Sequence, residues 1–430
     1  MSDETNISLN WLNKNKVLLS LDKNKQPIWG SYNHIKNVQL IEKLSYGACS
    51  KQSDNLYLSG NNFFIKGDNL YSLKALQKDF IDKIKCIYID PPFNTGKTFD
   101  HYADSLKINL WLSMIKVRLE FMKKLLSRDG LIMVHIDDKK MPYLKVLMDE
   151  IFSGPKNVKN NNSNNAKNYV ATIVWQKKIS PQNDAKYFSD VHDFILVYAK
   201  NIKFLRINPI QRSEKQNSRY VNRDNDPRGA WASSDLTVKT PNSKWIYPIT
   251  LPSGRFVMPS KSRSWGVSRE KYQKLVKDNR IWFGANGNAM PRLKRLLTEV
   301  KKGIVPKTIW SRDEVGDNSE GKKEIKKFID INNKVFATPK PERLLMRIIQ
   351  IATNKGDWVL DAFLGSGTTC AVAHKLKRKW IGLENGRQLD DICIPRLKKV
   401  VDGKDNGGIS RNVNWQGGGG FIYYNFREGN

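Results

Sequence analysis

The chain has 430 residues, enough for two or three domains that each bury a core. Lysine and arginine number 73 against 42 acidic residues, and the net charge of +31 favours a polyanionic partner, nucleic acid before a membrane surface. No apolar run approaches the roughly 18 residues that span a bilayer, and the first residues show no secretion signal, so we expect a cytoplasmic protein without membrane contact.

Cysteine and histidine usage argues against a metal centre. The four cysteines form no C-x-x-C pair, and the five histidines show no paired spacing. We therefore expect reduced thiols, with no disulfide framework, zinc cluster or protein-bound catalytic metal.

The first 60 residues show no clear pattern, and an α/β pattern begins after them. FFIKGDNLYSLKALQKDF (63–80) predicts a strand, a Gly-Asp turn and a helix with Leu70, Leu73 and Leu76 on one face. KCIYID (85–90) is an apolar run that ends at a double proline, which is typical of a buried parallel strand.

The pattern continues to about residue 200. NLWLSMIKVRLEFMKKLL (109–126) has the helical period, and GLIMVHID (130–137) and DFILVYAK (193–200) predict strands. The predicted helix has a single apolar face, formed by Leu112, Ile115, Leu119, Met122 and Leu126. KNNNSNNAKNY (159–169) is typical of a mobile polar loop.

Residues 201–335 differ from their surroundings. They hold 29 lysines and arginines against 13 acidic residues, so a net +16 of the total +31 lies in under a third of the chain. Basic residues alternate there with five tryptophans, which suits a surface that grips phosphates and stacks on bases. An ordinary domain with tryptophans in its core is an equally good explanation for each of them. The five are Trp231, Trp245, Trp265, Trp282 and Trp310.

The α/β pattern returns after this segment. KPERLLMRIIQIAT (340–353) predicts a helix, DWVLDAFLGSGTTCAVAHKL (357–376) a strand, a glycine turn and a helix, and KWIGLEN (379–385) a further strand. We divide the chain accordingly into five parts. They are an N-terminal extension (1–60), one half of an α/β domain (61–200), an insert (201–335), the other half (336–400) and a C-terminal tail (401–430).

The stretch CIYIDPPFNTGKTFD (86–100) has two competing interpretations. Gly96-Lys97-Thr98 looks like the end of a phosphate-binding loop, which needs a glycine five residues before Gly96. That position is Pro91, and neither Pro91 nor Pro92 has an N–H to donate to a phosphate. A nucleotide-hydrolysing loop is therefore excluded here.

The other interpretation concerns an amino group attached to a flat ring. Such a nitrogen is a poor nucleophile because its lone pair is delocalised, and methylating it requires acceptors for both of its N–H bonds. The Asp90 carboxylate and the Pro91 carbonyl can accept them, and Phe93 can stack on the ring. An Asp-Pro-Pro turn can also be purely structural.

A second motif favours the chemical interpretation. LDAFLGSGTT places Asp361 at a strand end, with Gly365 and Gly367 in a turn that lets a ligand approach the backbone. Glu384 ends the next strand, where an acid can bind ribose hydroxyls. Alone, this turn would equally suit a nicotinamide enzyme; together with Asp90 to Phe93 and a basic insert, it indicates methyl transfer to a base.

At these motifs the sequence resembles the amino-DNA methyltransferases of the β arrangement, over most of residues 62–385. The resemblance implies a class I S-adenosylmethionine-dependent methyltransferase fold. This is an α/β fold with a mostly parallel seven-stranded sheet, a circularly permuted motif order and an inserted target recognition domain. It also implies S-adenosyl-L-methionine as the cofactor and an adenine rotated out of the duplex.

The resemblance assigns site residues at matching positions. It implies catalytic roles for Asp90, Pro91, Pro92 and Phe93. It implies cofactor contacts for Asp68, Lys340, Pro341, Asp361, Phe363, Gly365, Gly367 and Glu384. Because the tetrapeptide begins with Asp and not Ser, the resemblance favours adenine N6 over cytosine N4.

Further stretches are similar to modification subunits of Type III restriction–modification systems. They are RGAWASSDLT, WFGANGNAMPRLKRLL, WSRDEVGDNSEGKKEIKKF and QGGGGF. The expected partners are double-stranded DNA, a second copy of the chain and, less directly, a restriction subunit. A solitary or Type II enzyme, an RNA or protein amino-methyltransferase, a DNA-binding module with a decayed core, and an enzyme that both cuts and methylates stay open as alternatives.

Overall fold

The computed structural model describes residues 8–50, 53, 55–93, 106–152, 168–181, 185–301, 303–328 and 338–427. Residues 96–98 and most of the polar stretch 159–169 lie outside the described residues. The chain forms two compact units, one comprising Pro209–Val305 and the other the rest of the chain. The smaller unit thus lies inside the predicted insert 201–335, whose two ends belong to the larger unit.

The larger unit is built on one ten-stranded sheet, with strand order β18-β7-β8-β6-β5-β19-β20-β4-β21-β3. Its strands are β3 (Gln39–Gly47), β4 (Asn62–Lys66), β5 (Ile84–Ile89), β6 (Leu126–Ile136), β7 (Tyr169–Gln176), β8 (His192–Ala199), β18 (Ile309–Trp310), β19 (Trp358–Asp361), β20 (Lys379–Glu384) and β21 (Gly420–Arg427). The seven from β7 to β4 form the core of a class I methyltransferase fold, in which only β8 runs against its neighbours.

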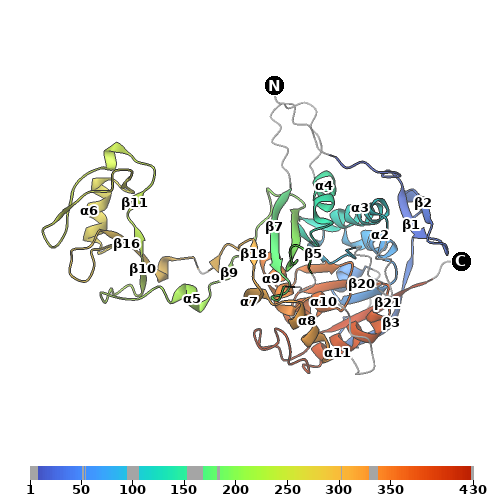
Figure 1. The fold of residues 1–430 in the computed structure, drawn as a ribbon. Helices are drawn as coiled ribbons and strands as arrows, with labels where there is room; N and C mark the ends of the chain where they lie inside the picture. Colours follow the sequence, from blue (N-terminus) through green and yellow to red (C-terminus); the bar gives the residue numbers. More distant parts are fainter. Residues whose placement is uncertain are drawn as a thin grey trace. The chain divides into compact units, whose positions relative to one another are not determined.

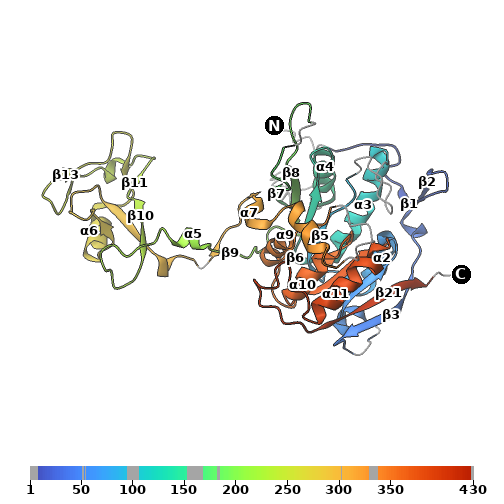
Figure 2. The same ribbon diagram turned by 60° about the horizontal axis from the view of Figure 1, so that its bottom comes forward.

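Helices cover both faces of this sheet (Figure 1, Figure 2). One layer contains α2 (Asn69–Phe80), α3 (Ile108–Leu125) and α4 (Met141–Phe152), and the other contains α9 (Glu342–Ala352), α10 (Thr368–Lys375) and α11 (Ile394–Val401). The central strands are apolar on both faces because both faces are covered. The predicted apolar faces of α2 and α3 are buried throughout, although Leu126 is the first residue of β6 and not the last of the helix.

The two ends of the chain contribute strands to the same sheet. β21 pairs in parallel with β4 and antiparallel with β3, so segments that lack a clear pattern in the sequence extend the core sheet at one edge. β18 extends the other edge by pairing with β7. The remaining elements of this unit are β1 (Val17–Leu21), β2 (Pro27–Gly30), a 3-10 turn at Tyr32–His34, α1 (Leu56–Ser59), α7 (Arg312–Val315), α8 (Asn318–Ile325) and a π-helical turn at Leu389–Cys393.

The smaller unit is made of short strands around a small core. Its sheets pair β10 with β16 and β15, β11 with β14, β12 with β13, and β17 with β9. Its elements are β9 (Ile210–Gln211), α5 (Glu214–Asn217), β10 (Trp231–Asp235), β11 (Thr237–Val238), β12 (Ile249–Thr250), β13 (Phe256–Val257), β14 (Ser264–Trp265), α6 (Arg269–Lys277), β15 (Ile281–Trp282), β16 (Arg292–Leu296) and β17 (Gly303–Ile304).

Three of the five tryptophans of residues 201–335 are core residues. Trp231, Trp265 and Trp310 have no exposed surface, so base stacking is the wrong interpretation for them. Trp231 donates its indole N–H to Asp224 and Trp265 donates to the Tyr247 carbonyl, as expected of buried indoles.

Among the described residues, no helix combines the length and the apolar character needed to cross a bilayer.

Candidate active site

The carboxyl ends of β5 and β19 lie next to each other, and the connections that leave these two strands lead to opposite sides of the sheet. From β19 the chain crosses through α10 to β20, and from β5 it crosses through α3 to β6 on the other side. In open α/β sheets such a switch point leaves a crevice in which ligands bind. Asp90 directly follows β5, and Asp361 is the last residue of β19. The two motifs, far apart in the sequence, therefore meet at one edge of the sheet.

Asp90 has one carboxylate oxygen paired and one unpaired. Its Oδ2 accepts a hydrogen bond from Lys340 Nζ at 2.5 Å. Its Oδ1 is buried, and no group of the described residues donates to it. An unsatisfied buried polar atom costs about 1–3 kcal/mol. The geometry therefore provides an acceptor for a donor that is not among the described residues.

Lys340 reaches Asp90 from the segment that leads into α9. Pro341 is the N-terminal cap of this helix, so the lysine directly before it projects at the helix start. Its side chain is 7% exposed, and its Nζ lies 5.5 Å from the centre of the Phe93 ring. The described contacts of Lys340 are thus with the Asp90–Phe93 motif, and the cofactor contact predicted for Lys340 and Pro341 stays a prediction.

Phe93 is backed by a buried histidine that the sequence analysis did not single out. The Phe93 and His135 rings stack with centroids 6.0 Å apart and planes 16° apart. His135 is fixed by Tyr88 Oη at 3.1 Å and by Asp193 Oδ2 at 3.3 Å. Burial, with the charge of Lys340, lowers the pKa of His135, which favours the neutral ring. A histidine inside the apolar run GLIMVHID was the available signal.

The backbone of the same motif is fixed by α3. Trp111 is buried and donates its indole N–H to the Pro92 carbonyl at 2.7 Å. This bond holds the second proline of the turn, and Pro91 beside it is buried. The Pro92 carbonyl is therefore occupied, whereas the acceptor predicted from the sequence is the Pro91 carbonyl.

The turn after β19 has a backbone conformation that glycine adopts more readily than other residues. Gly365 and Gly367 have φ of 58° and 76°, in the left-handed region, and Gly367 caps α10. Asp361 accepts from the Phe363 N–H at 3.0 Å and from Thr369 Oγ1 at 2.5 Å. Burial raises the pKa of Asp361 to about 7, and the charges of Asp90 and Glu384 act in the same direction.

Glu384 joins this turn to the end of β20. Its carboxylate accepts from the backbone N–H of Gly365 at 2.8 Å, and from those of Asn385 and Gly386 at 2.9 Å each. The residue is 1% exposed. Its structural role is thus to hold two loops together, and the ribose contact predicted for it stays a prediction.

A buried ion cluster lies behind the glycine turn. Arg396 of α11 donates to the Ser366 carbonyl at 3.2 Å, to Thr368 Oγ1 at 2.9 Å and to Glu342 Oε1 at 2.8 Å. Lys375 also donates to Glu342 and pairs with Asp405. Burial favours the neutral form of Glu342, but Arg396 and Lys375 outweigh it and lower its pKa. Nothing in the local sequence indicates this cluster, because its members come from three helices and a loop.

Asp68 stands at the carboxyl end of β4 as the N-terminal cap of α2. Its carboxylate accepts from the Leu70 N–H and from Arg118, both at 2.8 Å. The next residue, Asn69, donates to the Ala362 carbonyl at 2.7 Å. Asp68 is therefore linked through its neighbour to the glycine turn, while its side chain remains 38% exposed.

The smaller unit is strongly basic, and most of its few acids are already paired. It contains 20 lysines and arginines against 7 acidic residues. Five of these acids form ion pairs inside the unit, namely Asp224, Asp226, Asp235, Asp278 and Glu299. Most of the positive charge is therefore available to an external polyanion.

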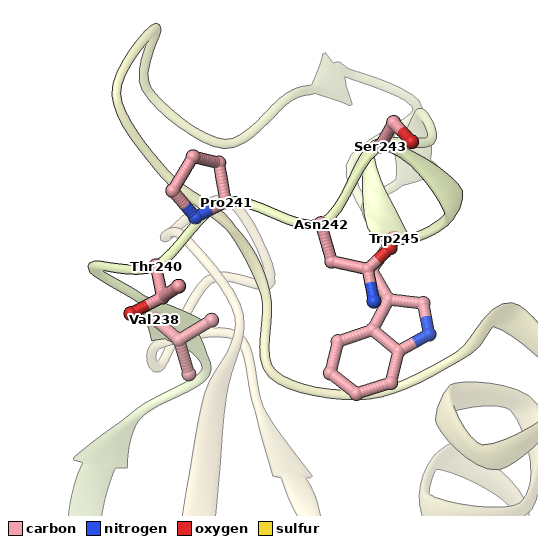
Figure 3. A pocket seen from close by; sticks show the side chains of 6 residues that line it. All are labelled: Val238, Thr240, Pro241, Asn242, Ser243 and Trp245. Atoms are coloured by element: carbon pink, nitrogen blue, oxygen red, sulfur yellow. The ribbon is translucent and has the colours of Figure 1, made fainter.

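Figure 3 shows a hollow on this unit that is bordered by hydroxyl and amide groups as well as by an indole. Trp245 is half-buried there, unlike the core tryptophans. Hydroxyl and amide groups can both donate and accept, which suits the edges of bases. The lining residues are Val238, Thr240, Pro241, Asn242, Ser243 and Trp245.

The sheet order, the switch point and the acidic turn together define an α/β protein of the methyltransferase class. Comparison with known proteins gives the family: the model of the N6_N4_Mtase family, described as DNA methylase, matches residues 84–393. The chain belongs to this family of DNA methylases.

Similar proteins with curated names include modification subunits. The chain is 32% identical over 429 residues to the probable type III restriction-modification enzyme HindVI Mod subunit of Haemophilus influenzae, covering 89% of this chain and 56% of the relative. It is 34% identical over 394 residues to the type III StyLTI Mod subunit of Salmonella typhimurium, covering 80% and 57%. It is 22% identical over 337 residues to the DNA adenine methyltransferase YhdJ of Escherichia coli, covering 77% and 81%. The chain thus spans little more than half the length of the two modification subunits.

Proposed function

We propose that the chain is a sequence-specific DNA methyltransferase that transfers a methyl group from S-adenosylmethionine to N6 of an adenine rotated out of the duplex. The observation that carries the proposal is the unpaired Oδ1 of Asp90 at the switch point, beside a glycine turn. A buried acceptor with no donor of its own in the described chain suits an amino group of a substrate.

The residues around the glycine turn are compatible with the cofactor. Asp90, Asp361 and Glu384 bring three carboxyl groups together, as their mutual effect on the Asp361 pKa indicates. A sulfonium cation is favoured by such surroundings. The two left-handed glycines allow a ligand close to the backbone. When bound, S-adenosylmethionine supplies a methyl group on a positively charged sulfur.

In this proposal the chain's own residues orient the amino group. Asp90 Oδ1 accepts one N–H and the Pro91 carbonyl the other, which draws the nitrogen lone pair out of conjugation with the ring. Lys340 holds Oδ2 and so fixes the rotation of the carboxylate. Phe93, backed by His135, stacks on the base. Catalysis is thus by alignment and electrostatics, and the surplus proton leaves to solvent.

Two features support adenine over cytosine. The tetrapeptide begins with Asp, and one relative is named as a DNA adenine methyltransferase. Methylation of cytosine N4 is the nearest alternative, because it presents the same kind of amino group. RNA or a protein amide as the substrate is the more distant one.

The basic smaller unit supports duplex DNA as the partner. Its unpaired lysines and arginines suit phosphates, and the hollow around Thr240 and Asn242 offers groups able to read base edges (Figure 3). We assign it to target recognition, within the insert predicted from the sequence.

We further propose that the enzyme works in the cytoplasm as the modification component of a restriction–modification system. The likeness to two named Mod subunits supports this role. We expect a homodimer, and a restriction subunit as a further partner. Light scattering of the active enzyme tests the dimer, and a fully active monomer would contradict it.

Methyl incorporation tests the central proposal. The purified chain, with labelled S-adenosylmethionine, should modify duplex DNA and leave RNA and bulk protein unlabelled. Modified-base sequencing of DNA from cells that express the chain should then report N6-methyladenine within one short sequence. Label in RNA or protein alone, or N4-methylcytosine in the DNA, would overturn the corresponding part of the proposal.

A further inference from the structure

Two adjacent aromatic side chains project from the larger unit with almost no protein around them. Tyr187 and Phe188 are 81% and 96% exposed, and Ile179 of the same loop is 55% exposed. Exposing large apolar side chains singly is common, but two consecutive rings at this level on one loop are not explained by the packing of the chain.

The loop that carries them has a fixed base. It connects β7 to β8, and Lys177 at its start donates its N–H to the Val191 carbonyl at its end, at 2.9 Å. The Lys177 ammonium also pairs with Asp190 at 2.7 Å and with Asp193 at 2.8 Å. Both carboxylates outweigh burial and raise the pKa of Lys177, so this clamp is charged at neutral pH.

The base of the loop is directly connected to the candidate active site. β8 is antiparallel to β6, so the start of β8 lies at the carboxyl edge of the sheet, the edge that carries Asp90. Asp193, which binds Lys177, also binds His135, and His135 stacks on Phe93. The base of the loop that carries the exposed rings is thus connected to the site through Lys177, Asp193 and His135.

The size and charge of the exposed group indicate its partner. Two aromatic side chains bury about 150–250 Å² each, which together is below the roughly 800 Å² per side of a stable protein interface. They match the apolar wedges with which proteins enter a single base step of DNA. Lys178 and Lys186 flank them, and Lys186 lies 5.2 Å from the centre of the Tyr187 ring. Cations beside the rings suit the phosphates on either side of such a step.

We propose that Tyr187 and Phe188 are a wedge that enters the base stack of duplex DNA and stabilises the extruded state of the target base. The inference rests on the proposed function, since it requires a base to leave the duplex. The rings occupy space from which the base has departed and stack on its neighbours, so extrusion becomes less unfavourable. Tyr187 and Phe188 are positioning residues in this scheme and take no part in the methyl transfer itself.

The test compares the double variant Tyr187→Ala/Phe188→Ala with the parent chain on two duplexes that contain the methylated sequence. One duplex has the target adenine paired with thymine, and the other has it mispaired. On the paired duplex, methyl transfer should fall by about tenfold to a hundredfold, which is the ratio expected when stacking on one base is lost. On the mispaired duplex, methyl transfer by the double variant should stay within about threefold of the parent, because extruding a mispaired base costs little free energy. With 2-aminopurine at the target position, the fluorescence rise on binding should be reduced in the variant.

Two controls separate the possible causes. Leu58→Ala removes another strongly exposed apolar side chain, which is 74% exposed. Leu58 lies in α1, which leads into the amino end of β4, whereas the candidate site lies at the carboxyl ends of the strands. This variant should methylate both duplexes as the parent does. Phe188→Trp, with Tyr187 kept, should retain near-parental activity. Equal activity of the double variant and the parent on paired DNA, or an equal loss on both duplexes, would overturn the wedge. Failure of the parent chain to methylate any DNA would instead refute the proposed function.

Discussion

Two turns meet at the carboxyl edge of the sheet, and they satisfy their carboxylates differently. In the turn after β19, Asp361 and Glu384 accept hydrogen bonds from the loops around them. In the turn after β5, Asp90 has one oxygen held by Lys340 and the other unpaired within the described chain. The first arrangement ties the loops together, and the second leaves an oxygen that can still accept a hydrogen bond.

This difference separates residues that shape the site from a residue that, in the proposed function, acts on the substrate. A carboxylate that already binds several backbone N–H groups contributes mostly to the stability of its loop. A carboxylate with an unsatisfied buried oxygen gains a partner only when a ligand arrives, so its effect is expected in turnover. The variants below are chosen to separate these two kinds of contribution.

The largest effect is expected from Asp90→Ala. It removes the proposed acceptor of the amino group, and methyl transfer should fall by about a hundredfold to a thousandfold. Binding of S-adenosylmethionine, measured by calorimetry, should change by less than about threefold, since the glycine turn and the other two carboxyl groups, Asp361 and Glu384, are intact. Near-normal turnover would remove Asp90 from the mechanism.

Glu384→Ala should instead lower stability and cofactor binding. It leaves three backbone N–H groups without their acceptor, at about 1–3 kcal/mol for each that water cannot reach. The melting temperature and the cofactor affinity should therefore both drop. If the two variants behaved alike in both measurements, the distinction between the two turns would be wrong.

Arg396→Met should mainly lower stability. It removes one cation from the buried Glu342 and two hydrogen bonds from the glycine turn, at a cost of about 3 kcal/mol. Chemical denaturation measures this change. Arg343→Met is the matched control on α9, because Arg343 and Glu320 form a partly exposed pair that should contribute at most about 1 kcal/mol. Equal losses in the two variants would contradict the importance of the buried cluster.

Lys340→Met tests whether this lysine acts by holding Asp90 or by contacting the cofactor. If it acts by holding Asp90, kcat should fall by about tenfold to a hundredfold while the KM for S-adenosylmethionine stays within about threefold. Lys340→Arg should recover part of the rate. A higher KM with unchanged kcat would instead support the cofactor contact predicted from the sequence.

The smallest effect on methyl transfer is expected from Glu324→Gln, and its effect on stability depends on pH. Burial, together with the charge of Glu342, raises the pKa of Glu324 to about 8 from the ordinary 4.5. The folded chain thus binds a proton there that the unfolded chain releases, and this contribution to stability is lost as pH rises from about 5 to 8.

The variant carries no ionisable group at this position and can still accept from the Glu342 N–H. Its stability relative to the parent should therefore increase between pH 5 and pH 8. Urea denaturation across this range measures the difference, and parallel curves for both proteins would show that Glu324 is not the group responsible.

Local patterns predict the centre of the fold and both turns. Apolar runs that end at Asp90 and Asp361 predict buried parallel strands, because strands covered on both faces need no polar alternation. The structure ends β5 just before Asp90 and ends β19 at Asp361. Gly365 and Gly367 do adopt the left-handed conformation that makes such a turn recognisable in the sequence.

Local sequence patterns do not predict the outer strands of the sheet or the side chains that surround the site. β3 is an edge strand and β21 lies next to it in the sheet. Both pair with residues far along the chain, so the local sequence of either strand does not show where it pairs. Trp231 and Trp265 look the same in the sequence as a stacking residue would, and only packing buries them.

The sequence by itself determined the features from which we infer the chemistry of this protein: an acid followed by two prolines and an aromatic ring, a glycine turn, and a large excess of positive charge. These properties depend on residue type and on neighbours a few positions away. The tertiary structure alone decided which oxygen of Asp90 has no partner among the described residues, that Lys340 binds the other, and that His135 stacks on Phe93. Each of these joins side chains from different strands and helices, and such contacts arise only when the sheet brings its carboxyl ends together.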